Sequence, residues 1–318
     1  MKQEKFNVKA FFTKYAIVII SIALFAFFSV VADNFFSAKN VANLLRQVSI
    51  NGICAVGMAC VILTGGIDIS VGGIIGVSGV VCAYNMSQGM NPVLASMISL
   101  ALGIGIGCFS SLCITKVGIA PMIATMGVNT ALRGTAYLLT GGTAIFDFPK
   151  SYSVIGQGYV FGVPVPVIIM ILVFICGTIF LTKTRFSRYI YGVGANEEVA
   201  RLSGINVDRV KMTAYAISGF CAALAGLVLL GRVSSGQPKA GEGYEMDIIT
   251  AVVMGGVSLT GGEGKIQYVI FGVLVMGILS NGMTMLAIND YWQRVAKGIV
   301  LLLAVGFDRY MQKKKALS

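Results

Sequence analysis

The chain has 318 residues, of which 56% are apolar and only 12% charged, and its mean hydropathy is +0.85. A water-soluble protein of this length needs a far more charged surface, so the composition excludes one. The net charge of +11 suits the excess of cations on the cytoplasmic loops of a membrane protein, so no nucleic-acid partner is expected, and the lack of histidine excludes His-based catalysis.

Apolar stretches follow one another almost from end to end, which predicts one all-α integral membrane domain over residues 1–318 with no separate soluble domain. About ten transmembrane helices are expected, and their boundaries are uncertain by a few residues. The predicted spans are 15–32, 47–65, 70–86, 92–115, 120–140, 164–182, 212–231, 247–260, 267–288 and 295–308.

Ten crossings place both termini on the same side of the membrane. The face that carries the termini also receives most of the lysines and arginines, including those of a long loop at about 183–211. Cytoplasmic loops are enriched in Lys and Arg, so both termini and this loop are predicted to be cytoplasmic, in the cell membrane of a multi-pass protein.

The stretch "LTGGIDISVGG" (63–73) lies between the second and third apolar runs and contains four glycines and one acid. Gly65 and Gly66 permit a turn that other residues disfavour. Asp68 or Ser70 is predicted to cap the next helix and to satisfy backbone N–H groups that lipid would leave unpaired. We interpret the stretch as a buried helix junction near a translocation path, and favour an architectural turn over a direct substrate contact.

The letters "LTGG" recur at 63–66, 139–142 and 259–262, each at the end of an apolar run. Interrupted membrane segments in two halves of a chain suggest an inverted repeat around a substrate path, although chance recurrence is a rival explanation. Small residues four apart are predicted to pack helices within the bundle rather than to form a dimer. These pairs are Gly103 with Gly107, Gly72 with Gly76, and Ala222 with Gly226.

Polar side chains inside two spans are candidates for a substrate path. Thr125, Asn129 and Arg133 share one helix face, and Asn281 lies in a second polar cluster, with Ser280 and Thr284. The alternative is hydrogen bonding between helices. Arg133 is predicted to be the only deeply placed charge and cannot relay protons, so coupling to an ion gradient is disfavoured.

The stretch "GGEGKI" (261–266) resembles a phosphate-binding loop but lacks the first glycine and the Ser/Thr after the lysine. The chain is therefore predicted not to hydrolyse ATP, and its energy is expected to come from a partner. The loop 183–211 is where that partner would dock. Within it, Asn196 is predicted to cap a short helix that begins at Glu197 and Glu198 and stops at Gly204.

Several long motifs together resemble the permease subunits of ribose-type bacterial ABC importers, a family that also serves xylose, arabinose, galactose and autoinducer-2. The likeness runs in order from about residue 34 to residue 310. The motifs are "LTGGIDISVGG", "GVNTALRGTAYLLTGG", "GANEEVARLSGINVDRVK", "VVMGGVSLTGGEGKI" and "ILSNGMTMLAINDYWQRVAKGIVLLLAVGFD".

The resemblance implies a pore of two permease chains, either two copies or this chain with a paralogue. It also implies two ABC ATPase subunits, which bind ATP and Mg, and an extracytoplasmic sugar-binding protein, while this chain binds no cofactor itself. The stretch "NEEVARLSGI" looks like the family's ATPase-coupling loop. The coupling role is carried onto Glu197, Glu198, Ala200, Arg201, Leu202 and Gly204.

The expected function is import of a sugar, ribose or a similar monosaccharide, by alternating access and without an enzymatic step in this chain. Two alternatives stay open at this point. One is a branched-chain amino-acid or nucleoside permease of the same superfamily, and the other is a self-sufficient facilitator.

Overall fold

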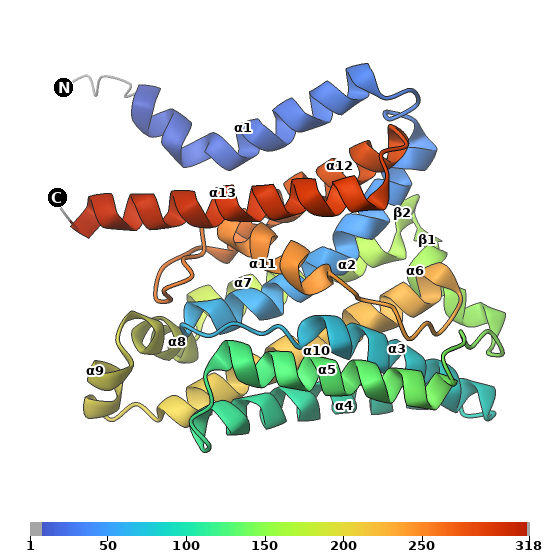
Figure 1. Cartoon of the computed structure of the whole chain (residues 1–318), viewed down its shortest axis with the longest axis horizontal. Coiled ribbons are helices and arrows are strands. Elements are labelled where there is room, and N and C mark those ends of the chain that lie inside the picture. Colours follow the sequence, from blue (N-terminus) through green and yellow to red (C-terminus); the bar gives the residue numbers. More distant parts are fainter. Residues whose placement is uncertain (1–7, 317–318) are drawn as a thin grey trace.

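The computed structural model describes residues 8–316, and long helices account for most of them (Figure 1). The all-α fold class is confirmed for this part of the chain, apart from one two-stranded hairpin. The helices are α1 (Val8–Val31), α2 (Ala38–Leu63), α3 (Val71–Ser87), α4 (Pro92–Thr115), α5 (Pro121–Thr140), α6 (Val154–Gln157), α7 (Val165–Lys183), α8 (Arg185–Ala195), α9 (Glu197–Leu202), α10 (Val207–Val233), α11 (Tyr244–Met254), α12 (Ile266–Met285) and α13 (Asp290–Ala316).

Two smaller elements lie between α5 and α7. A 3₁₀ turn, η1 (Lys150–Ser153), precedes α6, and a hairpin of β1 (Tyr159–Val160) and β2 (Val163–Pro164) follows it. The hairpin lies at one end of the bundle in Figure 1, whereas α8 and α9 lie at the other end, where α1 begins and α13 stops.

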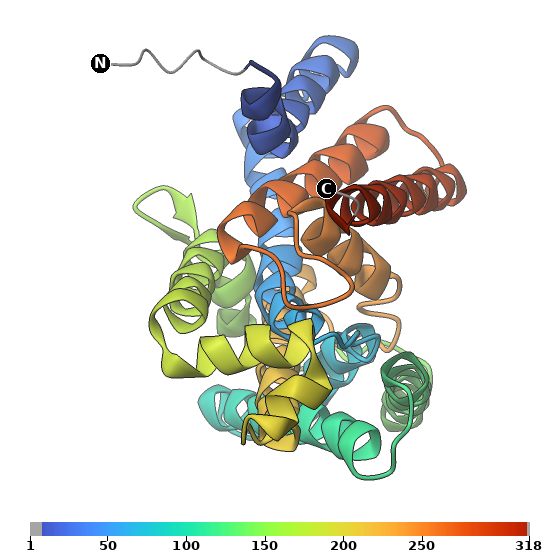
Figure 2. The same ribbon diagram turned by 90° about the vertical axis from the view of Figure 1, so that its left-hand side faces the viewer.

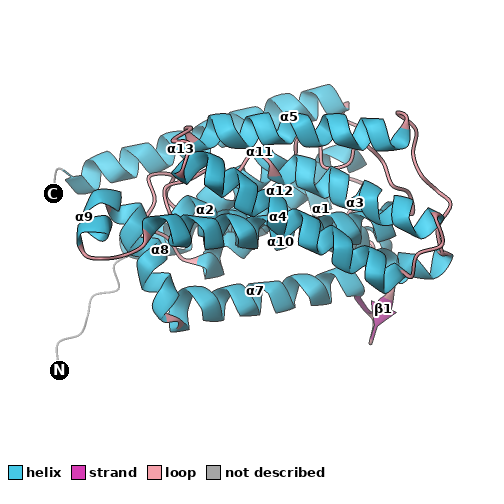
Figure 3. Cartoon of the chain, turned by 90° about the horizontal axis from the view of Figure 1, so that it is seen from below, coloured by secondary structure: helices cyan, strands magenta, loops and turns pink. Residues whose placement is uncertain are grey.

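Helices α2 and α10 form the centre of the bundle because they are apolar around their whole circumference. Their most apolar windows are 83% and 78% buried, against 33% for α4 and α7 at the periphery. In Figure 2, α5 (green) and α13 (dark red) run along one side, and α7 (light green) runs along the other; Figure 3 agrees. Five described helices, α2, α4, α7, α10 and α12, are long and apolar enough to cross a membrane.

Small residues bring α4 against α10, as the sequence predicts. Gly103 lies against the carbonyl of Gly219 and the methyl of Ala223, and Gly107 lies against the carbonyl of Tyr215. A Cβ at either glycine would collide with the partner backbone. The prediction of packing within the bundle is therefore confirmed for this pair of helices, and Gly226 of α10 meets α3 in the same way.

Two helices begin inside the bundle after a non-helical stretch of chain. Residues 64–70 precede α3, and residues 234–243, which consist largely of turns, precede α11 (Figure 1). The second stretch runs along α3, where Gly76 faces the carbonyl of Ala240 and Gly72 faces that of Gly241. Because these glycines have no side chains, the backbone of the stretch fits directly against the helix.

Among the element boundaries that differ from the sequence prediction, two have a clear local cause. Helix α2 begins at Ala38 rather than 47, since Ser37 caps it and accepts a hydrogen bond from the Asn40 backbone, and polar residues hide this first part from a hydropathy scan. Helix α11 ends at Met254 rather than 260, because Gly255 and the left-handed Gly256 stop it. Its 11 residues give about 16 Å, too short to cross a bilayer unaided.

Candidate functional site

Helix α9 forms where local signals in the sequence place it. The Asn196 side chain accepts a hydrogen bond from the backbone N–H of Val199 at 3.0 Å, and Gly204 follows the helix with φ +81°. Both the cap and the stop are confirmed. Val199 and Leu202 are exposed, Leu202 to 83%, so α9 presents apolar side chains at the end of the bundle.

Helix α9 is held to the bundle by its own charged residues. The Glu197 carboxylate pairs with Lys211 of α10 at 2.6 Å and with Arg201 at 3.1 Å, while Ala200 is buried beneath the helix. Of the predicted coupling residues, Glu197 and Ala200 thus face inward or bond within the chain. Glu198, Arg201 and Leu202 are exposed.

The end of α8 rests on two backbone segments of the bundle. Gly194 lies against the carbonyl of Leu63 and the N–H of Gly262, and the Gly262 N–H donates to the Leu63 carbonyl at 3.0 Å. Nearby, the Tyr191 hydroxyl donates to the carbonyl of Gly264 at 3.0 Å. Burial raises the pKa of Tyr191, which keeps this hydroxyl protonated as a donor.

The "LTGG" sequences at 63–66 and 259–262 therefore meet each other beneath α8. The third, at 139–142, ends α5 at the opposite end of the bundle (Figure 1). They follow α2, α11 and α5, so they mark different kinds of connection and not equivalent positions of two halves.

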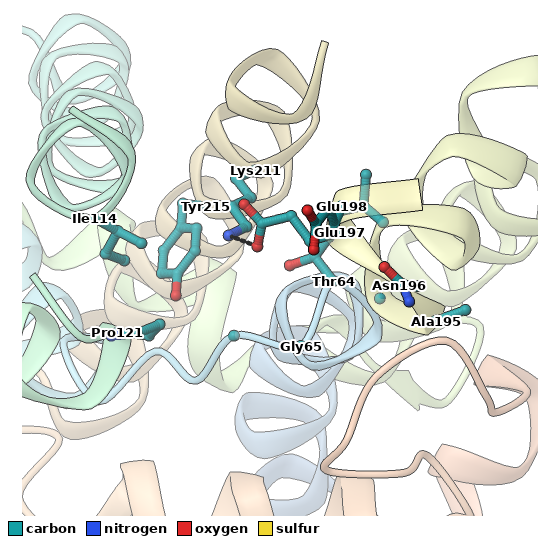
Figure 4. A pocket seen from close by; sticks show the side chains of 13 residues that line it. Thr64, Gly65, Ile114, Pro121, Ala195, Asn196, Glu197, Glu198, Lys211 and Tyr215 are labelled. Atoms are coloured by element: carbon teal, nitrogen blue, oxygen red, sulfur yellow. Dashed lines mark hydrogen bonds and ion pairs between the residues drawn. The ribbon is translucent and has the colours of Figure 1, made fainter. Parts of the chain in front are cut away.

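A cavity of about 530 Å³ opens beside this contact (Figure 4). Glu197 of α9 and its capping residue Asn196 line one side, Lys211 and Tyr215 of α10 line another, and Gly65 lies in its wall. The space between α9 and α10 is therefore not filled by side chains.

Asp68 is fully buried and bound by three donors. The N–H and hydroxyl of Ser70 donate to one carboxylate oxygen, and the hydroxyl of Ser218 on α10 donates to the other at 2.7 Å. Of the two residues predicted to cap α3, Asp68 accepts the backbone N–H of Ser70 just before the helix, at 3.0 Å, whereas the Ser70 hydroxyl turns to Asp68 and caps no N–H of α3. A buried carboxylate needs such donors, so this cluster fixes the start of α3 against α10.

The residues around Asp68 tie the same junction to other helices. The Thr125 hydroxyl of α5 accepts from the N–H of Ile69 at 3.1 Å, and the Tyr215 hydroxyl donates to the carbonyl of Ile67 at 3.3 Å. Gly65 adopts φ +78°, and Gly66 leaves room for the Tyr215 hydroxyl. The predicted turn at Gly65 is confirmed.

Three ion pairs surround the first turn of α11. Glu245 lies 3.7 Å from Arg133 of α5, Asp247 lies 2.6 Å from Lys297 of α13, and Glu242 just before the helix lies 3.6 Å from Arg294. The prediction that Arg133 is the only deeply placed charge is wrong, since Asp68 and Asp247 are buried too. Together the residues of these three ion pairs form a charged cluster between α5 and α13.

The remaining path candidates fall into two environments. Asn129 lies close to Arg133, against Gly73 of α3, and its side-chain oxygen has no hydrogen-bond partner within residues 8–316. Asn281, in contrast, exchanges two hydrogen bonds with Asn40 of α2, at 2.9 and 3.1 Å. Thr284 bonds the carbonyl of Ser280 in its own helix.

Glu245, Asp247 and Lys297 were not singled out by sequence reasoning. The available signal was the glycine-rich stretch "SSGQPKAGEG" (234–243), which contains Glu242 and precedes Glu245 and Asp247, much as the glycines of 63–73 surround Asp68. Such a stretch inside a hydrophobic region predicts irregular backbone that lines a cavity or packs against protein.

Comparison with known proteins gives a consistent picture. A family model described as "Branched-chain amino acid transport system / permease component" matches residues 40–305. The "Ribose import permease protein RbsC" of Bacillus subtilis is 44% identical over 283 residues, which cover 88% of each chain. The protein of the same name from Haemophilus influenzae is 41% identical, over 99% of each chain.

A more distant relative is the "L-arabinose transport system permease protein AraH" of Escherichia coli, 35% identical over 98% of this chain and 95% of its own. No solved structure matches the chain.

Proposed function

Because the chain belongs to the family of branched-chain amino acid transport system permease components, we propose that it is the multi-pass permease subunit of an ATP-driven importer in the cell membrane. Its proposed cargo is ribose or a similar monosaccharide. One observation carries the choice of cargo: relatives named as ribose import permeases are 40–44% identical over most of the chain.

The proposed topology has ten crossings with both termini in the cytoplasm. The clustering of basic residues on the loop with α8 and α9 supports this orientation. Helix α11 and residues 234–243 together make up one broken crossing, as do α3 and residues 64–70. Irregular backbone at that depth is acceptable because it is buried against other helices.

An inverted repeat of two halves is also proposed, relating α2–α5 to α10–α13. In each half a central helix leads through a non-helical stretch to a shorter helix that starts inside the bundle. The packing pattern supports the relation: α3 contacts α4, α5 and α10, as α11 contacts α12, α13 and α2.

The sugar path is proposed to run along the charged cluster between α5 and α13. Ionisable groups do not face lipid, so this side of the bundle is expected to face water and a second permease chain, a copy or a paralogue. Asn129 and Arg133 offer amide and guanidinium groups to sugar hydroxyls there. Thr125 and Asn281 are assigned to holding helices together, in view of their bonds.

The partners at the two ends follow from the same scheme. An ABC ATPase that binds ATP and Mg is proposed to seat on α9 through Glu198, Arg201 and Leu202, and an extracytoplasmic sugar-binding protein is proposed to deliver cargo at the opposite end. Hydrolysis then belongs to the ATPase, and this chain performs no covalent chemistry.

The proposed mechanism is alternating access. Nucleotide binding by the ATPase moves α9, whose neighbour α8 bears on Leu63 and on Gly262. The motion passes through residues 64–70 to α3 and, through Asp68 and Ser218, to α10. Nucleotide and binding protein can shift this equilibrium only if each prefers one conformation.

Uptake in proteoliposomes tests the function. Labelled ribose should accumulate when the chain is combined with an ABC ATPase and a sugar-binding protein of a ribose importer and with ATP on the ATPase side, and it should not enter with the chain alone. Labelled leucine, run in parallel, should not accumulate. Uptake by the chain alone would identify a facilitator, and uptake of leucine instead of ribose would identify an amino-acid permease.

Replacing Leu202 by Glu, or Glu198 by Lys, should abolish co-purification of the ATPase and ATP-driven uptake. Both side chains are exposed, and the ion pairs that hold α9 in place are made by other residues, so these changes spare the packing of α9 itself. Lys150→Glu, at the opposite end, reverses a charge without touching α9 and should leave ATPase binding intact. ATPase binding that survives both α9 variants would refute the coupling role.

A further inference from the structure

The β-hairpin at residues 159–164 has no part in the transport scheme above. Tyr159 pairs with Pro164 and Val160 with Val163, so only Phe161 and Gly162 form the turn. Both turn residues are left-handed, with φ +50° and +80°, as a two-residue type I′ turn requires.

Phe161 is an unusual residue for this position. A left-handed backbone is unfavourable for a residue that carries a side chain, and such turns favour Asn, Asp or Gly instead. Its ring is also fully exposed, at 102% of the reference area. Backbone strain combined with an exposed aromatic ring points to a ring that binds something apolar outside the chain.

The start of α7 sets the depth of the hairpin. Helix α7 has 19 residues and begins at Val165, directly after β2, and its most apolar 18-residue window has a mean hydropathy of 2.7. The helix length of about 28 Å matches a hydrocarbon core of about 30 Å. The hairpin therefore lies at the boundary between acyl chains and headgroups, where aromatic side chains gather in membrane proteins.

The hairpin projects toward the side of the bundle where α7 exposes apolar side chains. Figures 2 and 3 show it projecting sideways from the bundle on the side of α7, away from α5 and α13. On that side α7 exposes Leu172, Ile175 and Ile179, which continue the apolar surface.

The hairpin and the residues next to it in the sequence are uncharged. From Ser151 to Thr182 the sequence has no charged residue. The cation next to the hairpin is Arg46, which stacks 4.8 Å from the centre of the Tyr159 ring and donates to the carbonyl of Gln157 at 2.8 Å. An uncharged tip suits lipid better than a polar protein surface.

We propose that this hairpin is a membrane anchor, which inserts Tyr159 and Phe161 into the interfacial region of the leaflet opposite α9. The lipid contact compensates for the strained turn and fixes the depth of α7 in the bilayer. The anchor depends on membrane insertion of the chain and is independent of the cargo.

Tryptophan fluorescence tests the anchor in the full chain. Trp292 is the single tryptophan of the sequence, so Trp292→Phe gives a silent background for Phe161→Trp, reconstituted in phosphatidylcholine vesicles. We expect a blue-shifted emission, protection from acrylamide, and stronger quenching by lipids brominated near the headgroup than near the chain ends. Tyr159→Trp, with its half-exposed ring, provides a second reporter if the first variant folds poorly.

Two control variants give the quenching expected for a tryptophan deep in the membrane and for one in water. Leu172→Trp, in the middle of α7, should be quenched best by deep bromines, and Leu202→Trp, on α9, should be quenched by acrylamide alone. Acrylamide quenching of Phe161→Trp equal to that of Leu202→Trp would overturn the proposal. An emission shift that requires added sugar-binding protein would overturn it too, because the tip would then be a protein-docking surface.

Discussion

Replacement of Gly107 by valine is expected to destabilise the folded chain by about 3 kcal/mol, the upper part of the range for overpacking. The new side chain would collide with the carbonyl of Tyr215 and crowd the backbone of Ala216. Neither atom can rotate away, since both belong to the main chain of α10. Helices α4 and α10 would have to separate along their whole contact, which includes Gly103 and Gly219. Thermal unfolding in detergent, followed by loss of the monodisperse peak, measures the effect.

The control for this variant lies two residues away on the same helix. Gly105 faces open space, and a Cβ added there would meet no atom of the described residues within 4 Å. Gly105→Val should therefore leave the unfolding temperature nearly unchanged, although it adds the same side chain at nearly the same depth. Equal losses in the two variants would mean that helix propensity, and not the α4–α10 contact, determines the cost.

Replacement of Lys297 by glutamine should cost about 3 kcal/mol, because it leaves the Asp247 carboxylate buried without its cation. The two groups are 2.6 Å apart, and their side chains are only 24% and 12% exposed. Asp247→Asn combined with Lys297→Gln should recover most of the loss, since two neutral amides can bond each other. Unfolding temperatures of the two single variants and the double variant form the test.

The pair between Arg294 and Glu242 serves as the matched control. It also joins the region of α11 to α13, but its side chains are 71% and 49% exposed. Arg294→Gln should therefore have no measurable effect on unfolding. A double variant no more stable than Lys297→Gln alone would show that the two charges are not coupled and that the geometry of the pair is unimportant.

Sequence reasoning succeeded where the signals are local. The cap of α9 at Asn196 and its stop at Gly204 depend on residues within one or two turns, and both are present as predicted. The turn at Gly65 and the packing of Gly103 and Gly107 are further cases, because glycine has few reasons to occur at such positions other than backbone freedom or close approach.

Sequence reasoning failed where partners lie far apart in the chain. Arg133 and Glu245 are separated by 112 positions along the sequence and meet only because α5 and α11 pack on α3. The reciprocal bonds of Asn40 and Asn281 could not be predicted either, because these residues also lie far apart in the sequence.

The end of α11 at Met254 was missed for a different reason. Apolar residues continue beyond it, so hydropathy does not mark the boundary, which is decided by the conformation of the glycines that follow.

The contact beneath α8 has a consequence for how such a transporter can evolve. Gly194, Leu63 and Gly262 meet through their main chains, and none of these three contacts depends on the identity of a side chain. In the proposed scheme, the surface that binds the ATPase is thereby separated from the contact that transmits its motion. Under that scheme, substitutions at Glu198, Arg201 and Leu202 would adapt the chain to a different ATPase while the contact beneath α8 stays the same.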